Sequence, residues 1–210
     1  MRVALLIAAG VAALTVTGCS SGPETPVATS TVPVILPGKP GESAQTLPPG
    51  ATVTAVPSPT ANAADVVFMR DMVVHHRQAL DMSRLAATRA ASQDVKRMAA
   101  RISGTQEPEM NAMIQWLRQQ GQRVPAHHDG HHAMPGMATD EQLASLRAAS
   151  GAGFDRLYLQ LMIAHHTGAV TMAAGELEKG SHITVQELAE DISVTQTAEI
   201  QRMHRMRPSG

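Results

Sequence analysis

The sequence predicts an all-α fold, a four-helix bundle made of two repeated helical hairpins. A motif centred on adjacent histidines occurs twice, as FMRDMVVHHRQALDM at residues 68–82 and YLQLMIAHHTGAVTM at residues 158–172. A shift of 90 positions superimposes the copies and stays in register, without a gap, over about fifty residues, which indicates an internal duplication. Apolar residues recur at helical spacing, and no convincing strand pattern occurs. Two such hairpins imply a pseudo-twofold axis, with the histidine pairs facing each other inside.

The N-terminal residues are expected to lie outside that bundle. Residues 1–18 are typical of an export signal, because Arg2 precedes an apolar stretch shorter than the roughly 20 residues that cross a bilayer. The stretch ends in Val-Thr-Gly-Cys, which resembles the bacterial lipobox and makes Cys19 the expected lipidation site. Residues 19–62 are rich in Pro and Thr and predict a disordered tether. Because Cys19 is the only cysteine, the folded domain at 63–208 offers no thiolate ligand or disulfide.

The first hairpin is expected over residues 64–120. Its first helix, at about 64–90, shows the periodic pattern of a wide apolar face. That face carries Phe68, Met72, His75, Ala79 and Met82. Ser92 is a suitable N-cap for the second helix, at about 93–120. Pro108 lies inside this second helix, and because proline lacks a backbone N–H we expect a kink there.

A loop at residues 121–138 connects the two hairpins. Thr139 is predicted to cap a short helix that follows the loop and ends at about Arg147. The glycines of residues 151–153 then predict a break in the chain.

The second hairpin is expected over residues 154–206 and repeats the first. Its first helix, at about 154–179, carries the equivalent face of Tyr158, Met162, His165, Ala169 and Met172. Its second helix, at about 184–206, repeats the pattern of residues 93–120. The folded part of the chain is therefore accounted for by four long helices and one short one.

The apolar faces of the long helices also carry polar side chains, which must be satisfied inside the bundle. They are His75, His76, Gln106, Glu109, His165, His166, Gln196 and Glu199. An unpaired buried polar group costs roughly 1–3 kcal/mol, so two solutions remain open: a hydrogen-bonded His–Glu and His–Gln network, or metal ligation by at least one histidine of each pair. Adjacent residues differ by about 100° around a helix, so at most one histidine of each pair points at the bundle axis.

Methionines near these polar positions favour the metal. Met72 and Met162 stand one turn from a histidine of each pair. Met113 and Met203 are further candidates, because each lies one turn from a glutamate. Methionine at helical spacing is otherwise more often core filler than ligand.

The connecting loop carries a second group of candidate ligands. They are His127, His128, His131, His132, Met134 and Met137. No core requires this composition, and a disordered polar loop is the alternative. Imidazole and thioether without a thiol suit copper, and methionine is a soft ligand for Cu(I). Histidines also hold zinc or other divalent metals, so copper is inferred from the methionines.

Together these motifs resemble the bacterial family called domain of unknown function 305. The resemblance rests on the doubled pattern F/Y-x3-M-x2-HH-x2-A-x2-M, each copy followed by I-x3-Q-x2-E-x3-M, across residues 64–206. It implies a ferritin-like four-helix bundle in an exported protein, with copper binding and resistance in some members and an MPGM-containing insert, here residues 134–137, in many. It also implies copper handling through Met72, His75, His76, Met82, Met162, His165, His166 and Met172. Pro108 departs from the repeat, because the second copy has Ala198 there.

The favoured function is that of a lipid-anchored metal-binding protein outside the cytoplasm, which buffers or carries copper without enzymatic turnover. Its partners would be the metal ion, the membrane through the lipid and a protein for metal transfer. The net charge of −1 and the aromatic content of 2% argue against nucleic-acid binding. The alternative is a structural or partner-binding envelope module with a hydrogen-bonded His/Glu core. A ferritin-like oxidase is disfavoured, because the inward carboxylates are only Glu109 and Glu199.

Overall fold

The computed structural model of this chain describes residues 28–29, 31–36, 43–53, 60–126 and 134–206. The chain divides into two units, Met1–Pro57 and Ser58–Gly210. The expected signal peptide, the lipidation site Cys19 and the loop histidines His127, His128, His131 and His132 lie outside the described residues.

The described residues of the first unit form four short strands, which corrects the expectation of a chain without strands. β1 (Ala28–Thr29) pairs antiparallel with β4 (Thr52–Val53), and β2 (Val34–Leu36) pairs antiparallel with β3 (Gln45–Leu47). Each strand has only two or three residues. The period-2 pattern needs a longer run to be recognised, so pieces this short escape a periodicity search. Isolated pairs of this size have little stability of their own.

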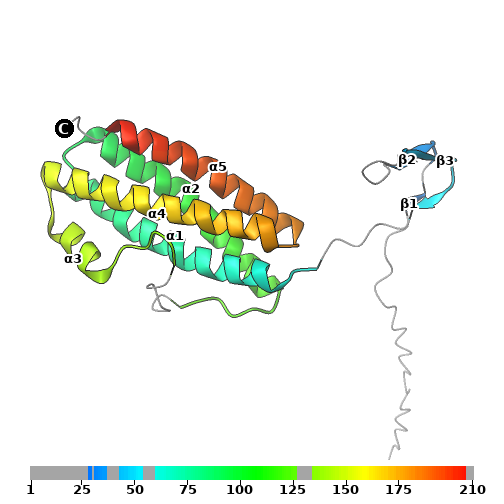
Figure 1. Cartoon of the computed structure of the whole chain (residues 1–210), viewed down its shortest axis with the longest axis horizontal. Coiled ribbons are helices and arrows are strands. Elements are labelled where there is room, and N and C mark those ends of the chain that lie inside the picture. The colour runs from blue at the N-terminus through cyan, green and yellow to red at the C-terminus, as the bar shows by residue number, and fades with distance from the viewer. Residues whose placement is uncertain (1–27, 30, 37–42, 54–59, 127–133, 207–210) are drawn as a thin grey trace, which may run out of the picture. The chain divides into compact units, whose positions relative to one another are not determined.

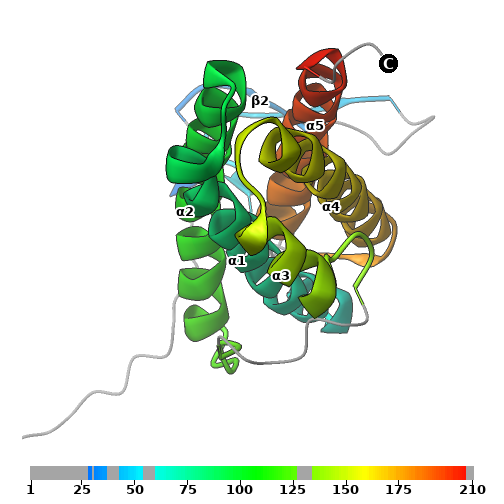
Figure 2. The ribbon, with the colours of Figure 1, turned by 90° about the vertical axis from the view of Figure 1, so that its left-hand side faces the viewer.

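The second unit is helical, as predicted. It contains α1 (Ala63–Arg89), α2 (Gln93–Gln119), α3 (Asp140–Ala148), α4 (Gly151–Lys179) and α5 (Ile183–Met206). α1 packs along α2, α4 packs along α5, and the two hairpins meet chiefly through α1 and α4 (Figure 1). The short α3 packs against α1 and α4, and Figure 2 shows it in front of one end of the long helices. In the described part of the chain, no helix combines the length and apolarity needed to cross a membrane.

The helix ends follow local capping chemistry. The predicted caps Ser92 and Thr139 are confirmed, since each side chain accepts hydrogen bonds from the first turn of its helix. Asn62 and Asp65 form a capping box at the start of α1. The expected break at residues 151–153 is wrong, because α4 begins at Gly151, whose φ of 61° turns the chain directly into the helix. Pro108 lies inside α2, which runs unbroken, and the kink stays a prediction.

The core consists of two apolar clusters with a polar layer between them. One cluster combines residues 79–86 of α1 with residues 154–162 of α4, and the other combines residues 68–73 of α1 with residues 169–173 of α4. On all four long helices, buried polar side chains lie between the two clusters in the sequence. We call these residues the polar layer: His75, His76, Gln106, Glu109, His165, His166, Gln196 and Glu199.

Candidate functional site

An inner pair of histidines, one from each repeat, lies within the polar layer. The ring centroids of His75 and His165 are 3.8 Å apart at an interplanar angle of 38°, and neither side chain is exposed. Burial, together with the charges of neighbouring histidines, lowers the pKa of His75 to about 3 and the pKa of His165 well below its usual value. Both imidazoles are therefore neutral at pH 7, the form in which histidine binds metals.

An outer pair of histidines bonds to the glutamates of the layer. His76 Nε2 lies 2.8 Å from Glu109 Oε2, and His166 Nε2 lies 2.9 Å from Glu199 Oε2. A carboxylate oxygen accepts, so each imidazole donates through Nε2. This division into an inner and an outer pair agrees with the 100° offset expected between adjacent residues of a helix.

Several ring nitrogens of these histidines have no hydrogen-bond partner in the described part of the chain, and they are the candidate metal-binding atoms of the layer. His75 Nε2 donates to the carbonyl of Pro135 at 3.1 Å, so His75 follows the same pattern as the outer histidines. The Nδ1 atoms of His75, His76 and His166 are buried and have no hydrogen-bond partner among the described residues. For His165 the same holds for both ring nitrogens. A ligating histidine characteristically has this arrangement, with one nitrogen held by an oxygen acceptor and the other free.

Two glutamines add further unsatisfied groups to the layer. Gln106 and Gln196 are 1% and 2% exposed, and neither amide has a hydrogen-bond partner among the described residues. The predicted His–Gln network is therefore not present, whereas the His–Glu bonds are. Each unpartnered buried group costs roughly 1–3 kcal/mol, so the layer is costly unless another polar species is bound there.

Both ends of the His/Met loop are attached to α1 beside the histidine pair. Arg77 Nη1 donates to the carbonyls of Pro125 and Ala126 at 2.8 and 3.1 Å. Gln78 makes two hydrogen bonds to the backbone of Ala138. Met134 and Met137, which flank the Pro135–Gly136 turn, are half-buried. The loop thus begins and ends at the level of the polar layer.

The candidate methionines of the helices lie in the adjoining apolar clusters. Met72 and Met113 belong to one cluster, and Met82, Met162 and Met203 belong to the other. All five are fully buried, and only Met172 is partly exposed. Their burial agrees equally with core packing and with ligation, so their ligand roles stay predictions.

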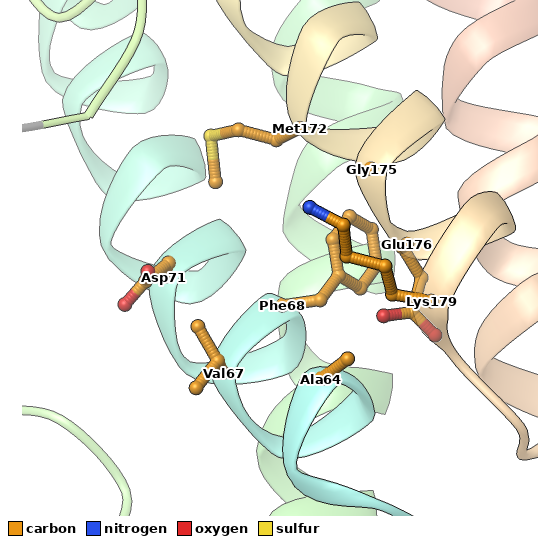
Figure 3. A pocket seen from close by; sticks show the side chains of 8 residues that line it. All are labelled: Ala64, Val67, Phe68, Asp71, Met172, Gly175, Glu176 and Lys179. Atoms are coloured by element: carbon orange, nitrogen blue, oxygen red, sulfur yellow. The ribbon is translucent and has the colours of Figure 1, made fainter.

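One pocket lies apart from the polar layer. This cavity of about 200 Å³ is lined by Ala64, Val67, Phe68, Asp71, Met172, Gly175, Glu176 and Lys179 (Figure 3). Met172 is its only candidate ligand. Among the described residues, no group of three or more His, Cys, Asp and Glu side chains is arranged to hold a metal ion.

Sequence reasoning missed the residues that surround the layer. Arg101 Nε lies 3.5 Å from Glu199 Oε1, and its exposed position on α2 gave no signal. Gln78 and Gly168 could have been noticed. Gln78 is a polar residue one turn from His75 on a buried face, and Gly168 is a glycine inside a helical pattern, which usually has a packing reason.

Comparisons with known proteins place the chain in a family. The family model described as "Domain of unknown function (DUF305)" matches residues 65–207. A DUF305 protein from Streptomyces coelicolor that is assigned as secreted shares 35% identity, with coverage of 68% of this chain and 91% of that chain and a TM-score of 0.63. A DUF305 fragment from Deinococcus radiodurans shares 34% identity, with coverage of 70% and 97% and a TM-score of 0.65.

The protein CopM in its Cu(II)-bound form shares 32% identity, with coverage of 68% of this chain and 94% of that chain and a TM-score of 0.59. CopM structures also exist with Cu(I), with Ag and in the apo form. No curated protein matches the sequence. The duplicated His-His helices, the buried polar layer and the match over residues 65–207 agree, and this chain belongs to the DUF305 family.

Proposed function

We propose that this protein binds copper outside the cytoplasm and buffers or carries the ion in copper homeostasis. The observation that carries the proposal is the state of the buried imidazoles. His75, His76 and His166 each hold an oxygen acceptor through Nε2 and leave Nδ1 unpartnered. Lone pairs buried in this way are unfavourable in a dry core and suitable for a cation.

The choice of copper rests on donor chemistry and on CopM. The bundle offers imidazole and thioether, while the single cysteine lies at position 19. This soft and borderline donor set suits Cu(I). CopM, at about one-third identity, has been solved with Cu(I), Cu(II) and Ag, and silver is likewise a soft monovalent ion. Zinc or another divalent metal is the alternative for a site built from histidine alone.

The proposed ligands come from both repeats of a ferritin-like four-helix bundle. At least one histidine of each pair would bind, with thioethers from Met72 and Met162 nearest along the chain and the loop residues collecting the ion. The carboxylates of Glu109 and Glu199 would orient the outer imidazoles and partly offset the charge of the ion. A lipid on Cys19 would hold the domain at a membrane. No turnover is proposed.

The alternative function is an envelope module without a metal. The His76–Glu109 and His166–Glu199 bonds favour it, because they brace α1 to α2 and α4 to α5 with no ion. This alternative leaves the amides of Gln106 and Gln196 and both nitrogens of His165 unexplained. A ferritin-like oxidase has less support, since the layer contains two carboxylates rather than about four.

A competitive Cu(I) titration of residues 20–210 tests the proposal. We expect tight binding that is weakened by the double substitution His75→Gln/His165→Gln and unchanged by His204→Ala, which alters an exposed histidine of α5. A third protein, with the four loop histidines changed to Ser, separates the loop from the layer. Wild-type binding no tighter than that of a His/Met-poor control protein would contradict the proposal and leave the envelope module as the better explanation.

A further inference from the structure

The end of the connecting loop, residues 134–138, is docked against both repeats. On the α1 side, Gln78 Nε2 donates to the carbonyl of Ala138 at 3.0 Å, and the Ala138 N–H donates to Gln78 Oε1 at 2.7 Å. Both residues are buried, so this is a strong two-point attachment. In the same segment, the carbonyl of Pro135 accepts a hydrogen bond from His75 Nε2.

On the α4 side, the attachment is a close approach of two backbones. A Cβ atom on Gly168 would lie 1.9 Å from the carbonyl oxygen of Pro135 and 2.8 Å from Gly136 Cα. A Cβ atom on Gly136 would lie 2.4 Å from the carbonyl oxygen of Ala164, and Gly136 has a φ of 77°. Backbone atoms cannot move aside as a flexible side chain can. Glycine is therefore required at both positions for residues 134–138 to dock.

The docking contacts fall where the duplication is broken. Gln78 and Gly168 are equivalent positions of the two repeats, separated by the same 90 residues as His75 and His165. One copy supplies hydrogen bonds to the segment and the other supplies space for it. Each stands three positions after an inner histidine. The two repeats have thus diverged at this position in a way that fits one and the same segment.

We infer that the docked Pro135 carbonyl is a positioning group for His75, and that Gly168 and Gln78 hold it in place. A carbonyl oxygen only accepts, so it fixes His75 as the tautomer with the proton on Nε2. The lone pair then stays on Nδ1, the nitrogen that has no partner in the layer. The part of this inference that concerns metal binding by Nδ1 rests on the proposed function. Loss of such an orienting partner weakens metal binding about 10- to 100-fold.

The substitution Gly168→Ala tests this inference, because its Cβ displaces the Pro135 carbonyl. Gly175→Ala is the matched control, since it lies on the same helix and its Cβ meets nothing within 4 Å. The first readout is the protonation of the His75 ring nitrogens by NMR in the metal-free chain, assigned with His75→Gln. We expect a single tautomer of His75, protonated on Nε2, in the wild type and in Gly175→Ala. In Gly168→Ala we expect a changed or mixed tautomer.

The second readout is Cu(I) affinity by competition, with about 10- to 100-fold weaker binding expected for Gly168→Ala and none of this loss for Gly175→Ala. Gln78→Met, which removes both bonds to Ala138 at similar volume, serves if Gly168→Ala does not fold. Wild-type tautomer and affinity in both Gly168→Ala and Gln78→Met would overturn the inference. If the wild type binds no Cu(I), the proposed function and the inferred role of Nδ1 in metal binding fail together. The tautomer comparison still decides whether the Pro135 carbonyl orients His75.

Discussion

The two repeats place the same side chains in the polar layer but surround them differently. The His76–Glu109 and His166–Glu199 bonds are nearly equal, at 2.8 and 2.9 Å. The Glu109 side chain is nevertheless 17% exposed, whereas the Glu199 side chain is 3% exposed and lies 3.5 Å from the guanidinium of Arg101. The position equivalent to Arg101 is Asp191, which offers no positive charge. The duplication thus kept the hydrogen bond while its dielectric environment diverged.

The two ends of the bundle repeat this contrast. Asp65 accepts from the N–H groups of Ser181 and His182 at the α4–α5 turn, and its equivalent Asp155 accepts from Ala91 and Ser92 at the α1–α2 turn. The turn clamp is therefore shared by both repeats. The side chains packed near the clamps are not shared: Glu176 is equivalent to Ala86, and the bonded pair Ser83–Tyr158 is equivalent to Ala173 and Phe68. Positions that satisfy backbone groups stayed the same, and positions that fill volume changed.

The largest difference between the repeats should appear when the two glutamates are removed. Glu199→Ala leaves the buried Nε2–H of His166 without its acceptor and removes the ion pair with the half-exposed Arg101, so we expect a loss of about 3 kcal/mol in the free energy of unfolding. Glu109→Ala should cost only about 1 kcal/mol, because the Glu109 side chain is partly exposed and water can take the place of its carboxylate. Urea denaturation of the metal-free proteins measures both. Equal losses would show that the difference in burial has no energetic consequence.

The Ser83–Tyr158 contact offers a way to convert one end of the bundle into the other. Ser83→Ala leaves the fully buried Tyr158 hydroxyl without its partner at 3.0 Å, and we expect a loss of about 1–3 kcal/mol. The double substitution Ser83→Ala/Tyr158→Phe recreates the Phe68–Ala173 combination of the other end. It should recover most of the stability, because removing both partners of a hydrogen bond is nearly neutral. A double variant no more stable than Ser83→Ala in thermal unfolding would contradict this equivalence.

Glu176 makes the stability of one end depend on pH. Burial, together with the nearby charge of Asp65, raises the pKa of Glu176 to about 8 from the ordinary value of 4.5. The folded state therefore holds a proton that the unfolded state releases between these pH values. The stabilising contribution is complete below pH 4.5 and is lost as the pH rises through 8, with a slope of at most about 1.4 kcal/mol per pH unit.

The comparison of wild type with Glu176→Gln isolates this effect from the other titratable groups, which the two proteins share. As the pH rises from 5 to 8.5, the free energy of unfolding of the wild type should fall relative to that of Glu176→Gln. Asp65 acts oppositely: burial raises its pKa, but hydrogen bonds from the backbone of Asn62 and His182 outweigh this and lower it. Its contribution is lost only in acid. Parallel stability profiles for wild type and Glu176→Gln would contradict the assignment.

The smallest expected effect concerns Gly175 of α4. Gly175→Ala should stabilise the protein by about 0.5–1 kcal/mol, because its Cβ meets nothing within 4 Å and alanine loses less backbone entropy in a helix. Gly168→Ala, seven residues earlier, should destabilise it through the clash with Pro135. Thermal denaturation of both variants measures the difference. Stabilisation by both substitutions would show that the docked segment moves aside without cost.

Much of the helical unit could be predicted from the sequence, because periodicity and capping act locally. The caps Ser92 and Thr139 and the ends of α1, α2 and α5 were found within about one residue. The failures were also local. The strands within residues 28–53 are too short to show a period. The sequence Gly151-Ala152-Gly153 predicted a break, but α4 begins at Gly151.

By itself the sequence determined that the chain is a duplicated, predominantly helical protein and that the histidines, glutamines and glutamates face its interior. A 3.6-residue period fixes which face of a helix is buried. Only the tertiary structure decided which of these groups meet: His75 with His165, His76 with Glu109, and Pro135 with His75 across Gly168. Those contacts depend on the stagger of the helices and on the approach of one loop to a single glycine. Neither leaves a periodic trace in the sequence, because each is set by packing between segments far apart in the chain.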